Sequence, residues 1–177
     1  MPRYCAFYGS INVGGNRLKM ADLRYVLERE DFENVETVVA SGNVLFDYDD
    51  RPTDGLEEML AWIMREHFDI ESFVAVRSPA EVREAIEGNP FRGESEDKFV
   101  HTHFLGGQPD EATFRSMLAI YSERGPERMA LGPRSLYVDY VQGAGNTKLT
   151  GPFIERRLGV AHTARNMSSL ARILDKM

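Results

Sequence analysis

Two segments of the chain combine residue types that bind anions. The first covers residues 11–17, which join a short apolar run to a stretch of helical periodicity. Backbone N–H groups at such a helix start, together with the helix dipole, suit a phosphate or a carboxylate. The residues expected to contact the ligand are Asn12, Gly14, Gly15 and Arg17, with Lys19 just beyond them. Neither the Walker pattern nor G-x-G-x-x-G occurs, so the segment predicts an anion site rather than a nucleotide site.

The second segment covers residues 162–166 and precedes the last helical stretch. Thr163 or Asn166 is expected to cap that helix, which leaves the Arg165 guanidinium available to bind an anion. We therefore predict a cleft in which residues 11–17 and 162–166 hold a small anionic ligand, such as a phosphate-bearing metabolite. Further candidate ligand residues are Ser41, Asn43 and Lys148.

Two other functions stay open for the same residues. An enzyme would use the cleft with Asn12, Ser41 or Asn43 placing its substrate, and a perturbed titratable group there would favour this reading. A protein-interaction module would use the two segments only to hold its lobes together. In the plainest alternative, the glycines serve a tight turn and the polar residues cap helices.

The remaining chemistry-bearing residues indicate neither a metal site nor catalysis. His101 and His103 lie two residues apart on an expected strand and share one face, as two metal ligands would. No third ligand is near in sequence, since His67 and His162 are distant, so the pair is expected to cover a half-exposed sheet face. Cys5 falls within an apolar run. The carboxylate pairs that are adjacent in sequence are not spaced as a general acid and base; they are Asp49-Asp50, Glu57-Glu58 and Glu96-Asp97. The sequence therefore names no catalytic residue, metal or cofactor.

The charge of the 177-residue chain, −7 in total, is unevenly spread. Residues 1–29 carry +3 and residues 141–177 carry +4, so the middle carries −14. An acidic chain disfavours a surface that binds nucleic acid or anionic lipid throughout, but it leaves room for one local basic site. A single cysteine and the lack of a long apolar run predict a cytoplasmic protein without disulfides or membrane spans. The sequence does not indicate an oligomeric state.

The elements that must position these residues alternate regularly in the first half of the chain. We expect strands near residues 4–8, 35–39, 44–48 and 72–76, helices at 20–30 and 52–68, and a connecting helix at 78–87. Ser41-Gly42-Asn43 is expected to form the turn of a hairpin. The order β-α-β-β-α-β is that of the ferredoxin-like fold.

Residues 88–98 are rich in turn formers and charge and mark an expected boundary. Beyond them, strands at 99–105, 128–131 and 136–141 and helices at 109–121 and 148–158 repeat the order without its last strand. A helix at 167–176 takes the place of that strand. We predict an α+β protein of two ferredoxin-like subdomains, residues 1–88 and 89–177, the second incomplete and ending in a helix.

Five short motifs occur in a characteristic order from one end of the chain to the other. They are Ile11-Asn12-Val13-Gly14-Gly15, Met20 with Leu23, Ser41-Gly42-Asn43-Val44, Asn89-Pro90-Phe91 and Thr163-Ala164-Arg165-Asn166. In this order they resemble the DUF1697 family, a domain of unknown function found mainly in bacteria. The resemblance covers residues 3 to about 174 and implies ferredoxin-like subdomains, but it implies no reaction and no cofactor.

The chain departs from this family pattern at two places. The family commonly has Arg-Gly before its Ile-Asn-Val-Gly-Gly motif, where this chain has Gly9-Ser10. An aromatic residue often follows the Arg-Asn pair, where this chain has Met167. The first change removes a positive charge from the expected anion site, and both weaken the inference that a ligand shared by the family is bound here in the same way.

Overall fold

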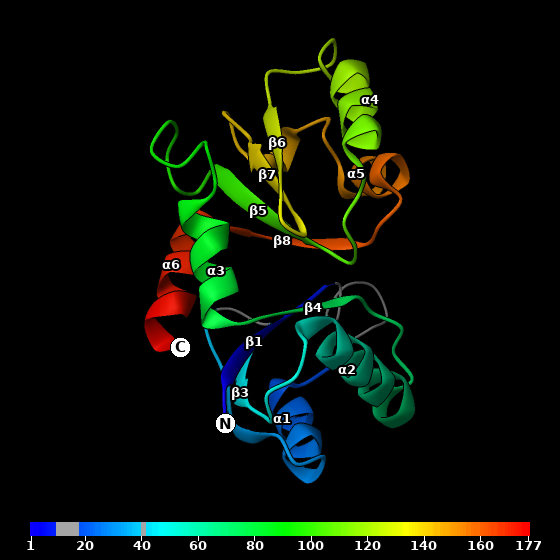
Figure 1. The fold of residues 1–177 in the computed structure, drawn as a ribbon, viewed down its shortest axis with the longest axis vertical. Helices are drawn as coiled ribbons and strands as arrows, with labels where there is room; N and C mark the ends of the chain where they lie inside the picture. The colour runs from blue at the N-terminus through cyan, green and yellow to red at the C-terminus, as the bar shows by residue number, and fades with distance from the viewer. Residues whose placement is uncertain (10–17, 40–41) are drawn as a thin grey trace. The chain divides into compact units, whose positions relative to one another are not determined.

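The structure is a computed structural model that describes residues 1–9, 18–39 and 42–177. The chain forms two compact units, one within residues 1–82 together with residues 172–177, the other of residues 83–171. Each unit carries a four-stranded sheet with helices packed on it, so the chain is an α+β protein (Figure 1). Among the described residues, no helix is both long enough and apolar enough to cross a membrane.

The first unit follows the order expected for it. Its strands are β1 (Arg3–Tyr8), β2 (Glu33–Thr37), β3 (Asn43–Asp47) and β4 (Val74–Arg77), and its helices are α1 (Met20–Arg29) and α2 (Thr53–Phe68). The sheet order is β2-β3-β1-β4, and all neighbouring strands are antiparallel. Helix α3 (Pro79–Glu87) follows β4 and begins with the expected capping box, in which Ser78 and Glu81 each bond the other's backbone N–H.

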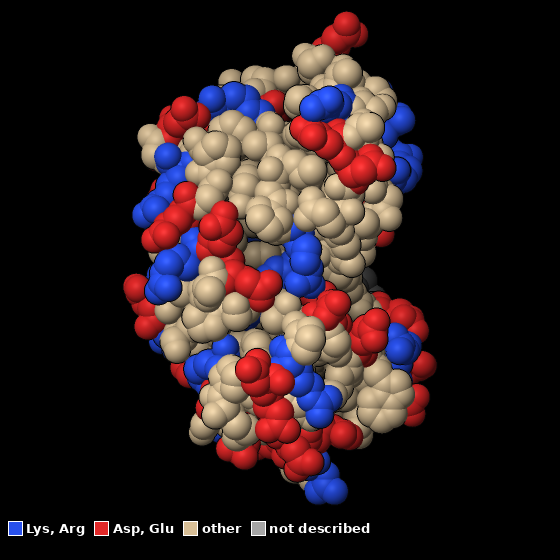
Figure 2. All heavy atoms as spheres, in the orientation of Figure 1, with Lys and Arg blue, Asp and Glu red and all other residues tan. Residues whose placement is uncertain are grey.

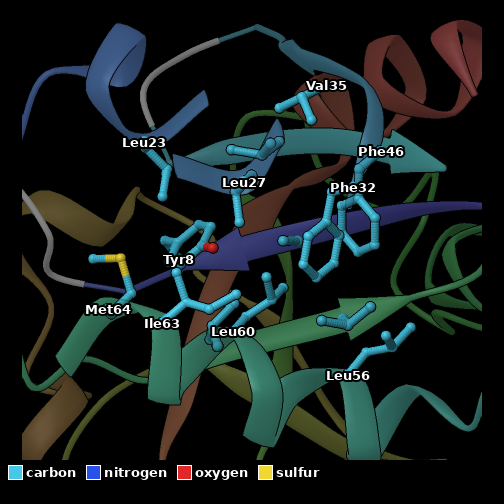
Figure 3. Close-up of a cluster of buried hydrophobic side chains, with 14 of the residues drawn as sticks. Tyr8, Leu23, Leu27, Phe32, Val35, Phe46, Leu56, Leu60, Ile63 and Met64 are labelled. Carbon is cyan, nitrogen blue, oxygen red and sulfur yellow. The ribbon is translucent and has the colours of Figure 1, made fainter. Parts of the chain in front are cut away.

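The core of the first unit lies between its sheet and the two helices α1 and α2. Figure 3 shows Leu23 and Leu27 of α1 facing the same layer as Leu56 and Leu60 of α2. All four side chains are fully buried, and each such burial stabilises the fold by about 2 kcal/mol. The helical periodicity of these leucines is what made both helices predictable from sequence.

A buried ion pair ties the end of β4 to α2. The carboxylate oxygen Glu57 Oε2 accepts hydrogen bonds from Arg77 Nη1 and from the backbone N–H of Val76, both at 2.8 Å. The Arg77 side chain is 3% exposed and the Glu57 side chain 11%. A buried guanidinium without its carboxylate would be strongly unfavourable, so the pair fixes how α2 lies on the sheet.

The second unit has the same succession of elements. They are β5 (Val100–Leu105), α4 (Glu111–Tyr121), β6 (Arg128–Gly132), β7 (Ser135–Asp139), α5 (Gly151–Leu158) and β8 (His162–Asn166). A short 3₁₀ helix, η1 (Ala144–Asn146), precedes α5, and α6 (Met167–Lys176) follows β8 directly. The sheet order is β6-β7-β5-β8, again antiparallel throughout.

The prediction that the second half lacks its last strand is wrong. Residues 162–166 form β8, which pairs with β5 along its whole length. The strand was missed because His-Thr-Ala-Arg-Asn shows no apolar alternation, and an edge strand of that composition is defined by its pairing rather than by its own pattern. The helix expected from Lys148 begins only at Gly151, where the Thr150 hydroxyl accepts a hydrogen bond from the N–H of Phe153.

In the second unit, α4 and α5 lie side by side on one face of the sheet (Figure 1). Their buried side chains, among them Phe114, Met117, Phe153 and Ile154, form one cluster with Leu105 of β5. Because side chains alternate along a strand, His103 and His101 share the face of Leu105. The expectation that these histidines cover a half-exposed sheet face is therefore wrong for His103, which is 3% exposed.

The buried ion pair makes a stability prediction for the first unit. Replacing Glu57 by Gln removes the charge that compensates Arg77, and we expect the free energy of unfolding to fall by about 3 kcal/mol. Glu58 is adjacent but exposed, so Glu58→Gln is the matched control and should change stability by less than about 0.5 kcal/mol. Urea denaturation of both variants at neutral pH measures the difference. Equal stabilities would show that the pair does not constrain the fold.

Candidate functional site

Three side chains from distant parts of the second unit form a continuous hydrogen-bonded chain. His103 Nδ1 lies 3.0 Å from His162 Nδ1, and His103 Nε2 lies 2.9 Å from the Tyr140 hydroxyl oxygen. On the far side, His162 Nε2 lies 3.0 Å from the backbone carbonyl oxygen of Gly151. The pairing of β8 with β5 brings His162 beside His103, although the two are distant in sequence.

The carbonyl of Gly151 sets the direction of every hydrogen bond in this chain. Because a carbonyl oxygen only accepts, His162 Nε2 must donate. With that single proton on its ring, His162 accepts at Nδ1. His103 Nδ1 therefore donates to His162, which leaves His103 Nε2 to accept the Tyr140 hydroxyl proton. In this arrangement both imidazoles are neutral, and each of their nitrogen atoms has a partner.

The surroundings of His103 oppose its protonation. Burial lowers the pKa of His103 well below its usual 6.5, and the nearby His162 and His101 rings lower it further. Burial also lowers the pKa of His101, although the carbonyl of Lys98, 3.2 Å from His101 Nε2, partly offsets this effect. Burial likewise raises the pKa of Tyr140 far above its ordinary value. His103 and Tyr140 thus stay uncharged at neutral pH.

The segment from Tyr140 to Gly151 connects the histidine chain to a surface concavity of about 200 Å³. Both ends of the segment bond the histidines, while Gln142, Thr147 and Lys148 between them line the concavity. The opposite wall comes from the end of α4 and the residues after it, including Tyr121, Arg124 and Glu127. We call this hollow the 142–148 concavity.

Glu127 anchors the wall of the 142–148 concavity. Its carboxylate accepts hydrogen bonds from the Tyr121 hydroxyl at 2.5 Å and from the Thr147 hydroxyl at 2.6 Å, one on each oxygen. Burial would raise the pKa of Glu127, but these two bonds and the charge of Lys148 hold it below its usual value. Burial and the bond to Glu127 together raise the pKa of Tyr121 to about 12.

Two glycines permit this arrangement. A Cβ atom at Gly125 would overlap both Glu127 Oε2 and the Tyr121 hydroxyl oxygen, so a side chain there would break the network. Gly143 has a φ of 99°, which disfavours other residues, and a Cβ there would lie 3.3 Å from the Phe99 ring. Both glycines line the concavity.

The residues predicted for the first unit fall mostly outside the described ranges. This applies to Asn12, Gly14, Gly15, Arg17 and Ser41. Lys19 is exposed, and its carbonyl oxygen accepts the first hydrogen bonds of α1, from the N–H groups of Asp22 and Leu23. Asn43 is 1% exposed and begins β3, so it is part of the interior of its unit. The cleft expected around residues 11–17 stays a prediction.

The residues predicted for the second unit have separate environments. Asn166 Oδ1 accepts from the N–H of Ser169 at 2.8 Å and so caps α6, as expected. Arg165 Nη1 donates to the Thr163 hydroxyl and to the Ala164 carbonyl, both at 2.9 Å, so this guanidinium is engaged within β8. Lys148 is exposed and lines the 142–148 concavity. Among the predicted residues, the structure thus brings Lys148 to a hollow surface.

Sequence reasoning missed Arg124, Glu127, Tyr140 and His162. Arg124 lies in the turn after α4, Glu127 directly before β6, Tyr140 directly after β7 and His162 in the unrecognised strand β8. No spacing rule connects such positions. The only available signal was the presence of two polar side chains, His101 and His103, on the face of the expected strand that also carries Leu105. Within the described part of the chain, no three His, Cys, Asp or Glu residues are grouped closely enough to hold a metal ion.

Charge on the surface does not by itself mark a ligand site. On the face drawn in Figure 2, Lys and Arg side chains are interspersed with Asp and Glu side chains over each unit.

Comparison with known proteins places the chain in a family. Residues 1–137 match the profile of the family described as "Protein of unknown function (DUF1697)". The chain belongs to the DUF1697 family. None of the curated proteins matches it. Among solved structures, this DUF1697 member is similar to the conserved bacterial protein SP0830 from Streptococcus pneumoniae, with 22% identity and a TM-score of 0.71 over 99% of this chain and 98% of the other. At that identity, the similarity establishes a shared fold.

The buried, uncharged imidazole of His103 predicts acid-sensitive stability. His103 has a folded pKa well below 6.5, whereas the unfolded chain titrates near that value, so its contribution is complete above pH 6.5 and is lost as the pH falls toward the folded pKa. We expect the free energy of unfolding to drop by about 1 kcal/mol between pH 7.5 and pH 5.5, measured by urea denaturation. His103→Phe should reduce this drop.

The matched control is His67→Gln, because His67 lies in the other unit, half-exposed beside Glu30. This variant should retain the full dependence on pH. Carboxylates contribute mainly at lower pH, so the chosen window isolates histidines. If His103→Phe kept the wild-type slope, the histidine chain would not be the acid-sensitive element.

Proposed function

We propose that this protein binds a small anion, such as a phosphate group, in the 142–148 concavity. The observation that carries the proposal is the composition of its lining. Arg124 and Lys148 supply two cations, while the one lining carboxylate, Glu127, has both oxygens occupied by hydroxyl groups. The net charge of the lining is therefore positive even though Glu127 interacts with Lys148, and the two hydroxyl bonds hold the carboxylate in the wall.

The cationic side chains have different surroundings. The Arg124 guanidinium carbon lies 5.2 Å from the centre of the Phe153 ring, an arrangement that restricts the guanidinium while leaving its N–H groups at the surface. Lys148 follows Thr147, whose hydroxyl donates to Glu127 and accepts from the N–H of Leu149 at 3.0 Å. These contacts order the backbone on both sides of the hollow and reduce the entropy lost when a ligand binds.

The size of the concavity limits the class of ligand. Drug-sized and cofactor ligands occupy pockets of about 300–1,000 Å³, so a hollow of about 200 Å³ suits a phosphate, a sulfate or a short carboxylate. The amide side chains of Gln142 and Asn146 also line it and add hydrogen-bonding groups for anion oxygens. A phosphate-bearing metabolite would place its anionic group here and leave its remainder outside.

The titration behaviour favours binding over acid-base catalysis at this site. A general acid or base works best with a pKa near the operating pH. Here the pKa of Glu127 is lowered and that of Tyr121 is raised to about 12, so both are held away from neutrality. An enzyme using the same residues is the alternative, and the histidine chain behind residues 140–151 is the feature that would serve it.

Three further proposals concern the protein as a whole. Each unit is a ferredoxin-like subdomain, supported by the β-α-β-β-α-β succession and by the position of the first strand between the third and the fourth. The subdomains divide near residue 88, where turn-forming residues begin. The protein works in the cytoplasm, since its one cysteine, Cys5, is buried in β1 and forms no disulfide.

Anion binding is tested by calorimetric titration with inorganic phosphate at low ionic strength. We expect saturable binding that Arg124→Ala and Lys148→Ala each weaken about fivefold, because a partly solvated charge contact contributes about 1 kcal/mol. A thermal-shift series with phosphate, sulfate and acetate ranks these anions by how far each raises the melting temperature. If none of them binds or raises the melting temperature, the proposal is wrong.

Two control variants locate the site. Arg115 is exposed on α4 and paired with Glu111 at 2.8 Å, outside the lining, so Arg115→Ala removes an equal charge and should leave affinity unchanged. Arg165→Ala tests the position expected from sequence. If Arg165→Ala abolished phosphate binding while Arg124→Ala did not, the anion would bind near β8 and the concavity would be excluded.

A further inference from the structure

Strand β6 ends the second sheet and has a free edge. In the sheet order β6-β7-β5-β8, its one neighbour among the described strands is β7. A free strand edge presents backbone N–H and C=O groups that another strand can bond. Its sequence, Arg-Met-Ala-Leu-Gly, contains neither the lysine nor the proline that commonly blocks such an edge.

The register shows which backbone groups point outward. The two-residue turn between Gly132 and Ser135 makes these two residues a hydrogen-bonded pair. The Leu105 N–H bonds the Arg134 carbonyl, so Arg134 directs its backbone groups to β5 and the next residue, Ser135, directs its own to β6. Bonding alternates along an antiparallel pair, so Ala130 bonds β7. Met129 and Leu131 therefore direct their N–H and C=O groups to the free edge, where no described residue bonds them.

A groove of mixed polar and apolar lining runs beside the same edge, with Gln108 and Glu111 among its lining residues. It has a volume of about 530 Å³ and is lined by Pro109 and Phe114 on one side and by Met129 and Leu131 on the other. Leu118 lies one helical turn beyond Phe114 on α4 and is 37% exposed, which is unusual for a large hydrophobic side chain in this chain. Outward backbone groups with apolar side chains beside them, here Met129, Leu131 and Leu118, are the features of a strand-pairing interface.

We infer that β6 pairs antiparallel with β6 of a second copy of this chain, about a twofold axis at Ala130. In that register Met129 lies opposite Leu131 of the partner, so all outward groups of both residues are bonded. Ala130 meets the partner's Ala130, the smallest side chain of the strand apart from glycine, which permits close approach. The pairing joins two four-stranded sheets into one continuous sheet.

The charges of the strand are compatible with this symmetry. Arg128 would lie opposite Gly132 of the partner, so no like charges face each other across the axis. The Arg128 guanidinium is already bonded within its own chain, to Asp139 at 2.6 Å and to Glu94 at 2.9 Å. The twofold axis also brings α4 of each copy to the same side of the sheet, where the Leu118 side chains become buried. A self-complementary edge favours a second copy over an unrelated strand.

The association is tested by sedimentation equilibrium of the full chain from about 10 µM to about 1 mM. We expect a monomer-dimer equilibrium in which Leu118→Glu shifts the dissociation constant at least about tenfold toward the monomer. Trp62 is 47% exposed on α2 of the other unit, and Trp62→Glu is the matched control that should leave the constant unchanged. A chain that stays monomeric at the highest concentration overturns the inference, as does a dimer disrupted by Trp62→Glu but not by Leu118→Glu.

Amide hydrogen exchange identifies the paired backbone groups without any substitution. The amides of Met129 and Leu131 should exchange quickly in dilute protein and become at least about tenfold slower in the dimer, whereas the Ala130 amide, bonded to β7 in both states, should not change. If dimerisation left the Met129 and Leu131 amides unprotected, the interface would lie elsewhere. Protection of these amides only after another protein is added would replace the second copy with a foreign strand and would also overturn the inference.

Discussion

A buried imidazole needs a partner for each of its two nitrogens, and this requirement organises the second unit. His103 lies on the helix-covered face of β5, where an unpaired polar nitrogen would be costly. Its partners are His162 on β8 and Tyr140 after β7, and His162 in turn bonds the Gly151 carbonyl at the start of α5. This chain of hydrogen bonds therefore connects β5, the end of β7, β8 and the start of α5. These contacts fix the path of the segment between Tyr140 and Gly151, and that segment forms one wall of the concavity.

The two units use the same succession of elements in different ways. In the first unit, the layer between sheet and helices is filled by leucine, isoleucine and aromatic side chains, with the Glu57–Arg77 pair at its margin. In the second unit, the corresponding apolar cluster lies beside a polar chain. The second unit tolerates polar side chains at one end of its interior, because antiparallel strand pairing and the packing of α4 on α5 hold the remainder of the unit together. The local polarity of the second unit is the reason that the proposed ligand site lies there.

The concavity and the free edge of β6 lie within one unit but depend on different physics. The concavity requires fixed hydrogen bonds, since Glu127 must be held by Tyr121 and Thr147 for the cations to dominate its lining. The edge requires only the alternation of backbone bonding along β6 and β7, together with the exposed Leu118. Substitutions that affect one need not affect the other, so the proposed ligand binding and the proposed self-association can be tested separately.

The sequence by itself determined the α+β class, the succession of elements in the first unit and the family, because helical periodicity, strand-length apolar runs and short ordered motifs are local patterns. It also located the caps at Ser78 and Asn166, which depend on neighbouring residues alone. Only the tertiary structure decided that residues 162–166 are a strand, that His103 and His162 touch, and that Arg124 and Lys148 line one hollow. These features arise from pairing between segments far apart in the chain, and the free energy that selects them comes from burial and hydrogen bonds that no local pattern records.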